Sequence, residues 1–92
     1  DMGVLLGRKP SAEVPAGAKS VKLEDPTRTI SRNHAAISFD QDGTLWIEDY
    51  GSLNGTYIIQ DDVETKVEHK PMQLEAPCTV RIGDQFFQFR KQ

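Results

Sequence analysis

The chain has 92 residues, of which 37% are hydrophobic and 27% charged, a composition typical of one soluble globular domain. Its apolar runs, such as residues 4–6, are far too short to span a bilayer, and no basic residue precedes that run as in a signal peptide. The net charge of −3 argues against a general nucleic-acid binder, and a single cysteine, Cys78, excludes an intrachain disulfide and favours a reducing, cytoplasmic setting.

The strand signals of the chain are short, and no stretch has the 3.6-residue apolar period of a helix. Asp42-Gly43 and Gly83-Asp84 are strong hairpin turn signals. Short strands separated by turns about every 8 to 12 residues indicate an antiparallel sandwich or barrel. Segments 10–20 and 61–71 are predicted to be loops, the second with one short edge strand. The predicted strands are 3–6, 21–23, 36–39, 45–48, 56–59, 79–82 and 86–89.

The charge is unevenly distributed along these elements. Residues 1–34 hold six bases and four acids, a net of +2, whereas the rest holds five bases and ten acids, a net of −5. An acidic domain with a local basic excess can hold a compact anion without binding every polyanion. A solvated face without a ligand would show the same pattern, so charge alone leaves both interpretations open.

Three polar motifs follow or join the predicted strands: Gly7-Arg8, segment 31–34 and segment 51–56. The guanidinium of Arg8 is a planar, permanently charged fork that fits two phosphate oxygens, and Gly7 keeps the turn before it free of a Cβ. The hydroxyl of Ser31 can donate one hydrogen bond to an oxyanion, and Arg32 adds a second cation. Presented from loops at one end of a β scaffold, these groups predict a receptor for a phosphorylated side chain.

The remaining motif residues are predicted to shape the loops or contact a peptide. Asn33 is expected to bridge to a ligand or to brace its own loop. His34 is expected to lock the loop by a ring hydrogen bond rather than act as a base. Asn54-Gly55 is a tight turn that accepts positive φ, with the amide of Asn54 facing a partner's backbone and Thr56 bracing from inside. Each motif alone is equally compatible with an ordinary surface arginine or a plain hairpin.

Catalysis and metal binding are the alternatives that the sequence disfavours. A hydrolase built from Ser31, His34 and Asp49 would lack a Gly-x-Ser-x-Gly elbow and an evident oxyanion hole. A metal site built from His34, His69 and Cys78 would lack a close ligand pair. We therefore predict no catalytic residue, no cofactor and no metal.

In this order the three motifs closely resemble the forkhead-associated (FHA) domain, a phosphothreonine-binding module. The family pattern is Gly-Arg after an early strand, then Ser-x-x-His, then Asp-x-Gly-Ser-x-Asn-Gly-Thr, which residues 7–8, 31–34 and 49–56 match. The resemblance extends from about residue 3 to residue 90, and segment 81–86 is similar to the family's final hairpin. Segment 25–32 is similar to bacterial, especially actinobacterial, members.

The resemblance implies an all-β fold, a two-sheet antiparallel β-sandwich of about eleven short strands in a single domain over residues 1–92, with binding loops at one end. It assigns phosphate contacts to Arg8 and Ser31, with Arg32 as an added contact. It assigns Asn54 to the peptide backbone, and we predict peptide contacts from Leu53 and Asn33 as well. The residues to which it gives an architectural role are Gly7, His34, Gly55 and Thr56.

Two departures from the family pattern affect these expectations. The family often has Thr where Leu53 stands, so a hydroxyl contact is lost there and only backbone and apolar contacts remain. The family also has a strand upstream of the Gly-Arg strand, whereas six residues precede Gly7 here. We expect that the first strand is missing or that a sheet has an open edge, which would invite pairing with another chain.

The sequence thus predicts a phosphothreonine-peptide recognition module in Ser/Thr kinase signalling. Its expected partners are an upstream Ser/Thr protein kinase and a phosphothreonine-containing protein or peptide, a segment of its own host protein included. We expect no nucleic acid and no direct membrane binding, in a cytoplasmic protein whose host could carry a membrane anchor. The alternative function is an interaction module that binds its partner independently of phosphate, through a sheet face or an open edge.

Overall fold

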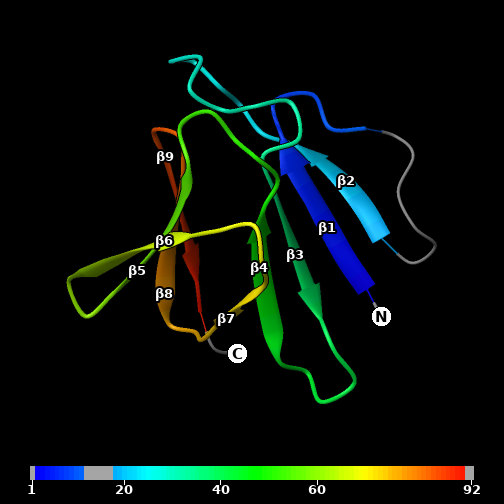
Figure 1. Cartoon of the computed structure of the whole chain (residues 1–92), viewed down its shortest axis with the longest axis vertical. Helices are drawn as coiled ribbons and strands as arrows, with labels where there is room; N and C mark the ends of the chain where they lie inside the picture. Colours follow the sequence, from blue (N-terminus) through cyan, green and yellow to red (C-terminus); the bar gives the residue numbers. More distant parts are fainter. Residues whose placement is uncertain (1, 12–17, 91–92) are drawn as a thin grey trace.

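The structure, a computed structural model, describes residues 2–11 and 18–90, which form nine β-strands in two sheets (Figure 1). No helix among these residues is long and apolar enough to cross a membrane. The strands are β1 (Met2–Gly7), β2 (Ala18–Lys22), β3 (Ala35–Phe39), β4 (Leu45–Asp49), β5 (Thr56–Gln60), β6 (Val63–Val67), β7 (Met72–Leu74), β8 (Cys78–Ile82) and β9 (Gln85–Phe89).

One sheet has the strand order β2-β1-β3-β4-β7 and the other the order β6-β5-β8-β9. All neighbouring strands are antiparallel except β1 and β2, which run in parallel and end together, since Gly7 is paired with Lys22. The predicted all-β, two-sheet sandwich is therefore confirmed, with nine strands in the described residues instead of about eleven and one parallel pair.

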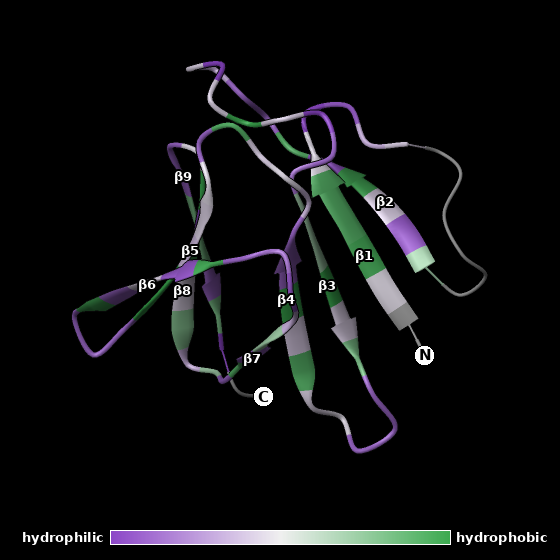
Figure 2. Cartoon of the chain, viewed as in Figure 1, coloured by the Kyte–Doolittle hydropathy of each residue, from purple (hydrophilic) through white to green (hydrophobic). Residues whose placement is uncertain are grey.

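The core lies between the two sheets, where strands alternate between buried and exposed side chains. In β8, for example, Cys78, Val80 and Ile82 are buried while the residues between them are partly exposed. Figure 2 shows hydrophobic colour along the strands and hydrophilic colour in most of the connections. Burying one such aliphatic side chain contributes about 1.5–3 kcal/mol. The core cluster consists of Ile30, Ile37, Ile47, Ile58, Val67, Leu74, Cys78, Val80 and Ile82.

Most predicted elements are confirmed, and the differences have physical reasons. Asp42-Gly43 lies in the connection of the β3–β4 hairpin, Gly83-Asp84 joins β8 to β9, and β6 is the edge strand expected within 61–71. Residues 18–20, predicted as loop, belong to β2 because pairing with β1 extends that strand, and the rest of the predicted loop from 12 to 17 lies outside the described residues. The sequence analysis missed β7, whose three residues are too few for a visible period.

The strand that carries the Gly-Arg motif is not an edge strand. β1 lies between β2 and β3, and in the described residues the strands paired on one side only are β2, β7, β6 and β9. At β9, Phe87 and Phe89 are partly buried against the core, whereas 62% of Phe86 is exposed. The sheets therefore have open edges in this part of the chain, which agrees with one of the two alternatives expected from the sequence. The other alternative, a missing first strand, stays a prediction.

Strand pairing brings the three polar motifs to one end of the sandwich (Figure 1). Leu6 at the end of β1 pairs with Ala35 at the start of β3, and Ala35 pairs with Asp49 at the end of β4. The connections that carry Arg8, residues 31–34 and residues 51–55 therefore start or finish at the same end of the molecule.

Candidate functional site

Arg8 is held at its Nε atom and leaves its outer donors free. Nε donates a hydrogen bond to the carbonyl of Ile30 at 3.3 Å and lies 3.8 Å from a carboxylate oxygen of Asp25. The backbone N–H of Arg8 donates to the carbonyl of Ser31 at 3.0 Å. No described residue hydrogen-bonds the two terminal guanidinium nitrogens, and 45% of the side chain is exposed. The outer face of the fork is thus oriented and open to a ligand.

Asp25 orients both Arg8 and the loop beneath it, a role that the sequence analysis missed. Its side chain is only 3% exposed, and its carboxylate accepts hydrogen bonds from the backbone N–H groups of Thr29 (2.8 Å) and Ile30 (3.2 Å). Arg28, inside this loop, has a φ of 57°, the left-handed region that few L-residues adopt. The Asp-Pro pair at residues 25–26 is a turn signal that could have drawn attention to this aspartate.

His34 locks the Ser31 loop as predicted for a structural histidine. It is fully buried, its Nδ1 accepts the backbone N–H of Ser31 at 2.9 Å, and Nε2 lies 2.8 Å from the carbonyl of Gly55. Because Nδ1 accepts, the proton sits on Nε2, which donates to Gly55. The ring therefore joins the loop that follows β2 to the loop that follows β4.

The hydroxyl of Ser31 keeps its proton free for a ligand. Its Oγ accepts the backbone N–H of Leu53 at 3.1 Å, and in the described residues the hydroxyl has no acceptor of its own. The hydroxyl is not bonded to His34, because that ring receives the backbone N–H of Ser31 instead. Ser31, His34 and Asp49 therefore do not form the hydrogen-bond chain that a hydrolytic triad requires.

Asp49 organises the 51–56 loop from inside. One carboxylate oxygen accepts the backbone N–H groups of Gly51 and Ser52, both at 3.0 Å, and the other accepts the hydroxyls of Ser52 (2.6 Å) and Thr56 (2.7 Å). Burial is the largest single effect and raises the pKa of this carboxyl, but the hydrogen bonds from the Ser52 hydroxyl, the Thr56 hydroxyl and the Ser52 backbone contribute to a lowering that leaves the net pKa below the ordinary value. Thr56 thus braces the loop from the core side, as expected.

Two glycines allow the loops to approach closely. A Cβ on Gly7 would lie 1.7 Å from the carbonyl oxygen of Arg32, so only glycine lets the end of β1 cross the Ser31 loop here. Gly55 has a φ of 86°, and a Cβ on it would lie 2.9 Å from the ring of Tyr57. The architectural roles expected of Gly7 and Gly55 therefore agree with their packing.

Asn54 ties two loops together while Leu53 points outward. The amide nitrogen of Asn54 donates to the carbonyl of Thr29 at 2.9 Å, which leaves the amide oxygen and one N–H for a partner. The side chain of Leu53 is 89% exposed, so it offers apolar contact at the rim. Asn33 lies elsewhere: its Oδ1 accepts the backbone N–H of Ser11 at 2.9 Å, a bracing contact, and its contact with a peptide stays a prediction.

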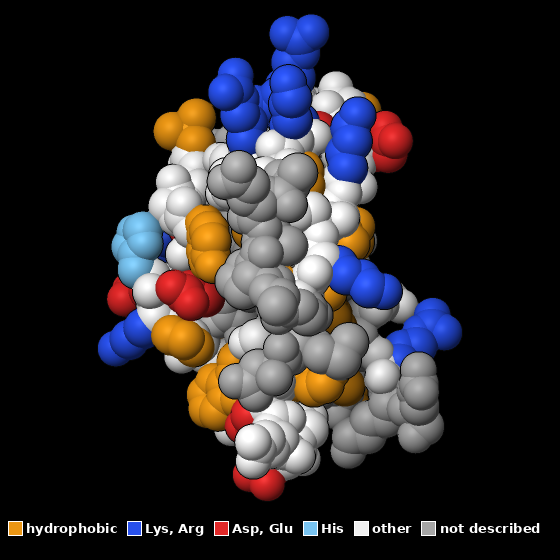
Figure 3. All heavy atoms as spheres, turned by 90° about the vertical axis from the view of Figure 1, so that its right-hand side faces the viewer, with side chains coloured by type: hydrophobic (Ala, Val, Ile, Leu, Met, Phe, Trp, Pro, Cys, Tyr) orange, Lys and Arg blue, Asp and Glu red, His pale blue; other side chains and the backbone are white. Residues whose placement is uncertain are grey.

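Together these loops line an open pocket of about 750 Å³ that is rich in positive charge. The predicted phosphate contacts all line it, and so do two of the three predicted peptide contacts. Figure 3 shows Lys and Arg side chains gathered at this end of the molecule. Guanidinium groups, a hydroxyl donor and a rigid frame suit a compact oxyanion. The lining residues are Arg8, Asp25, Arg28, Thr29, Ile30, Ser31, Arg32, Leu53 and Asn54.

Comparison with known proteins agrees with this geometry. The family model described as "FHA domain" matches residues 4–83. The chain is similar to the crystal structure of the FHA domain of CT664 from Chlamydia trachomatis, with 28% identity over 98% of this chain and 76% of that chain and a TM-score of 0.72.

Two further similar structures contain bound phosphopeptides. One is the MEK1 FHA domain in complex with a HOP1 phosphothreonine peptide (26% identity, 87% of this chain and 72% of that chain, TM-score 0.56). The other is the N-terminal FHA domain of Rad53p from S. cerevisiae in complex with a phosphothreonine peptide (23% identity, 88% of this chain and 56% of that chain, TM-score 0.60). At this identity, the similarity supports the fold alone.

Proposed function

The chain belongs to the FHA domain family, and from that premise we propose that it recognises phosphothreonine peptides and mediates phosphorylation-dependent protein–protein interaction in Ser/Thr kinase signalling. The observation that carries this proposal is that two side chains in the pocket have free hydrogen-bond donors. Arg8 has its Nε fixed and its outer nitrogens free, and Ser31 has its hydroxyl proton free in the same pocket. Both donors are set in place before any ligand arrives.

The site is expected to favour phosphothreonine strongly over unphosphorylated threonine. A phosphothreonine carries nearly two negative charges and three acceptor oxygens. A hydrogen bond to a charged group contributes roughly 1.5–3 kcal/mol, so two or three, discounted for exposure, favour phosphothreonine over threonine by about 3–5 kcal/mol. That preference corresponds to roughly a hundred- to several-thousandfold in affinity.

Binding rather than catalysis is the function that this geometry supports. FHA domains are interaction modules, and both ring nitrogens of His34 are used to hold loops together. A general base needs a ring nitrogen within reach of the proton that it abstracts, and here neither nitrogen of His34 is free. We propose that Arg8, Ser31 and Arg32 contact the phosphate and that Asn54 and Leu53 contact the peptide around it.

The biological setting is proposed from the sequence and from the similar domains. A bacterial origin is supported by the similar domain from Chlamydia trachomatis, and an actinobacterial-like subtype by the similarity of segment 25–32 to such members. A cytoplasmic location is supported by the single cysteine, Cys78. We propose that an upstream Ser/Thr protein kinase phosphorylates the bound segment and that this segment can belong to the host protein itself.

The open edge at β9 favours a second candidate function, phosphate-independent interaction. In the described residues β9 pairs only with β8, and Phe86 on it is 62% exposed. An unpaired strand edge with an exposed aromatic side chain can accept another strand. Such an interface would lie on β9, outside the pocket lined by Arg8 and Ser31.

Calorimetric titration with a degenerate phosphothreonine peptide library and its unphosphorylated twin tests the first candidate. Wild type should bind only the phosphorylated library, and Ser31→Ala should lose that binding. Ser38→Ala, which removes an exposed hydroxyl on β3, is the matched control and should bind like wild type. Equal binding of both libraries, or full binding by Ser31→Ala, would favour the phosphate-independent function instead.

A further inference from the structure

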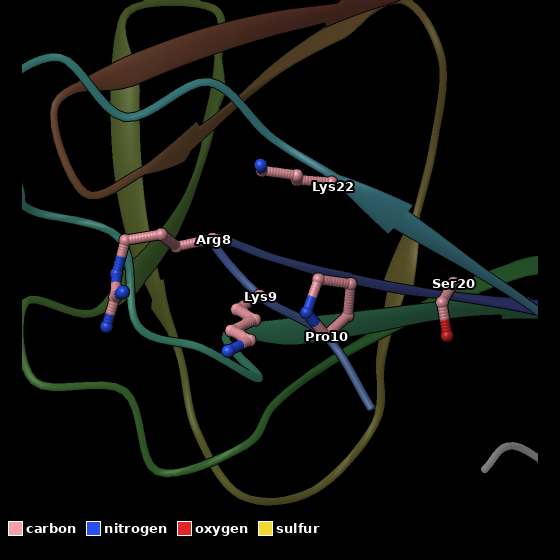
Figure 4. Close-up of a pocket in the computed structure, with 5 residues that line it drawn as sticks. All are labelled: Arg8, Lys9, Pro10, Ser20 and Lys22. Carbon is pink, nitrogen blue, oxygen red and sulfur yellow. The ribbon is translucent and has the colours of Figure 1, made fainter. Parts of the chain in front are cut away.

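A second hollow of about 530 Å³ lies beside the phosphate pocket (Figure 4). Arg8 lines both hollows, so the two are neighbours. Figure 4 shows the side chains of Arg8, Lys9 and Lys22 extending to the left of the view, with Lys22 above the β1 ribbon and Lys9 below it, while Pro10 and Ser20 lie to their right. The proposed function uses Arg8 but neither lysine, and all three cationic side chains are exposed.

The backbone fixes both lysines at the binding end of the molecule. Lys22 is paired with Gly7 in the parallel β1–β2 ladder, and the N–H of Leu23 donates to the carbonyl of Gly7 at 2.8 Å. The N–H of Lys9 donates to the carbonyl of Arg32 at 3.3 Å. The two chain segments are therefore held in place, and only the flexible side chains remain to meet a ligand.

The charges of Lys9 and Lys22 are not neutralised by an ion pair in the described part of the chain. The ion pairs in that part of the chain are Arg8–Asp25 and Arg81–Glu64, and neither involves Lys9 or Lys22. The outer nitrogens of Arg8 are assigned to the phosphothreonine phosphate, the hydroxyl of Ser20 donates to the carbonyl of Ser11, and Pro10 has no N–H. Two ammonium groups thus provide the polar contacts of the hollow, which favours an anion over a neutral side chain.

We propose that Lys9 and Lys22 form a second anion subsite, which binds a carboxylate or phosphate on the peptide that carries the phosphothreonine. This inference rests on the proposed function, because Arg8 places the subsite next to the phosphothreonine phosphate. A lysine ammonium is a point charge without the fixed fork of arginine, so it accepts carboxylates and phosphates alike. Because Arg8 lines both hollows, the second anion should lie near the phosphothreonine in the bound peptide.

The expected effect is moderate because the subsite is open to solvent. One exposed ion pair typically changes affinity about 1.4- to 5-fold. With two lysines, a second phosphate should tighten binding by about 3- to 10-fold and a carboxylate by about 2- to 5-fold. Raising the salt concentration should reduce this gain, since exposed charges are screened.

Peptide titration with matched libraries tests the subsite. The reference library has a central phosphothreonine and neutral flanking residues, and the test libraries add one aspartate or one phosphoserine at a single position on either side. The measured quantity is the affinity ratio of test to reference library. It is compared between wild type, the double variant Lys9→Gln/Lys22→Gln, and Lys19→Gln. Lys19 is the control because it lies on β2 but on the face opposite to Ser20 and Lys22.

The subsite is supported if at least one test position raises the ratio in wild type and Lys19→Gln, and the double variant brings it back to about one. A ratio near one in wild type, or a raised ratio that survives in the double variant, overturns the subsite while the reference library still binds. If the reference library itself does not bind, the proposed function fails and the subsite fails with it.

Discussion

Two aspartates at opposite ends of the β3–β4 region organise turns in a similar way, but only one belongs to the candidate site. Asp40, in the turn before β4, accepts two backbone N–H groups and the indole N–H of Trp46. Asp49, the last residue of β4, accepts two backbone N–H groups and the hydroxyls of Ser52 and Thr56. The turn of Asp40 lies at the end of the sandwich away from the binding loops (Figure 1).

The two carboxyls differ in burial, and that difference decides how far each influences the molecule. The indole hydrogen bond of Trp46 is the largest effect on the pKa of Asp40 and holds it below its ordinary value, against a smaller opposing effect of desolvation. For Asp49, burial is the largest effect and raises the pKa, and the surrounding hydrogen bonds overcome it only together. The exposed turn is thus a local feature, whereas the buried one couples the site loop to core packing.

The largest effect is expected from Asp49→Asn. The variant replaces one charged acceptor oxygen by a donor that faces N–H and O–H groups, and it removes the negative charge. Losing buried, charge-assisted hydrogen bonds should lower the free energy of unfolding by about 2–4 kcal/mol at pH 7. Urea unfolding followed by Trp46 fluorescence measures this loss. Binding of the phosphothreonine library should weaken too, because the 51–56 loop loses its frame.

The pH dependence of the free energy of unfolding, measured for wild type and Asp49→Asn, tests the role of the Asp49 charge. The pKa of Asp49 is lower in the folded state than its ordinary value of 3.8, so the carboxylate stabilises the fold above that pH. This contribution is lost as the pH falls through the folded-state pKa. The stability difference between wild type and Asp49→Asn should therefore shrink below about pH 3.8. A constant difference down to pH 2.5 or so would contradict the assigned role of the charge.

Thr56→Val should have a smaller effect, because it removes one of the four hydrogen bonds to Asp49 and preserves the shape of the side chain. Thr56 is fully buried, and its hydroxyl donates to Asp49 at 2.7 Å. We expect a loss of about 1–2 kcal/mol in the free energy of unfolding. Thr65→Val, at an exposed position of β6, is the matched control and should change stability little. If both variants lost the same stability, the hydrogen bond to Asp49 would not be the cause.

The sequence predicted best what depends on neighbours along the chain. The hairpin turns at Asp42-Gly43 and Gly83-Asp84 are set by local backbone preference. The contact of His34 with Ser31 and that of Thr56 with Asp49 lie within short motifs, whereas the bond of His34 to Gly55 joins two loops. These features agree with the structure because the residues that carry them also determine the local conformation.

Contacts between distant segments were harder to predict. Asp25 acts on Arg8, seventeen positions earlier in the chain by their numbering, and that contact exists only once the 25–31 loop folds over the end of β1. The neighbourhood of Lys9 and Lys22 likewise depends on the parallel pairing of β1 with β2, whereas the sequence favoured antiparallel strands throughout. Period-two alternation shows which residues form a strand but not which strand lies beside it.

Asp40→Asn should have the smallest effect and sharpens the contrast with Asp49. Its hydrogen bonds close a turn on the far side of the sandwich, so phosphothreonine-library binding should equal that of wild type. The melting temperature should shift by about 2 °C or less, as for most surface changes. The emission of Trp46 should nonetheless change, because its indole N–H lies 3.1 Å from Asp40 and loses a charged acceptor. A variant that alters the emission but not the binding shows that the turn is independent of the site. A loss of binding would instead mean that both ends of the sandwich are coupled through β3 and β4, and the two aspartates would then differ in degree only.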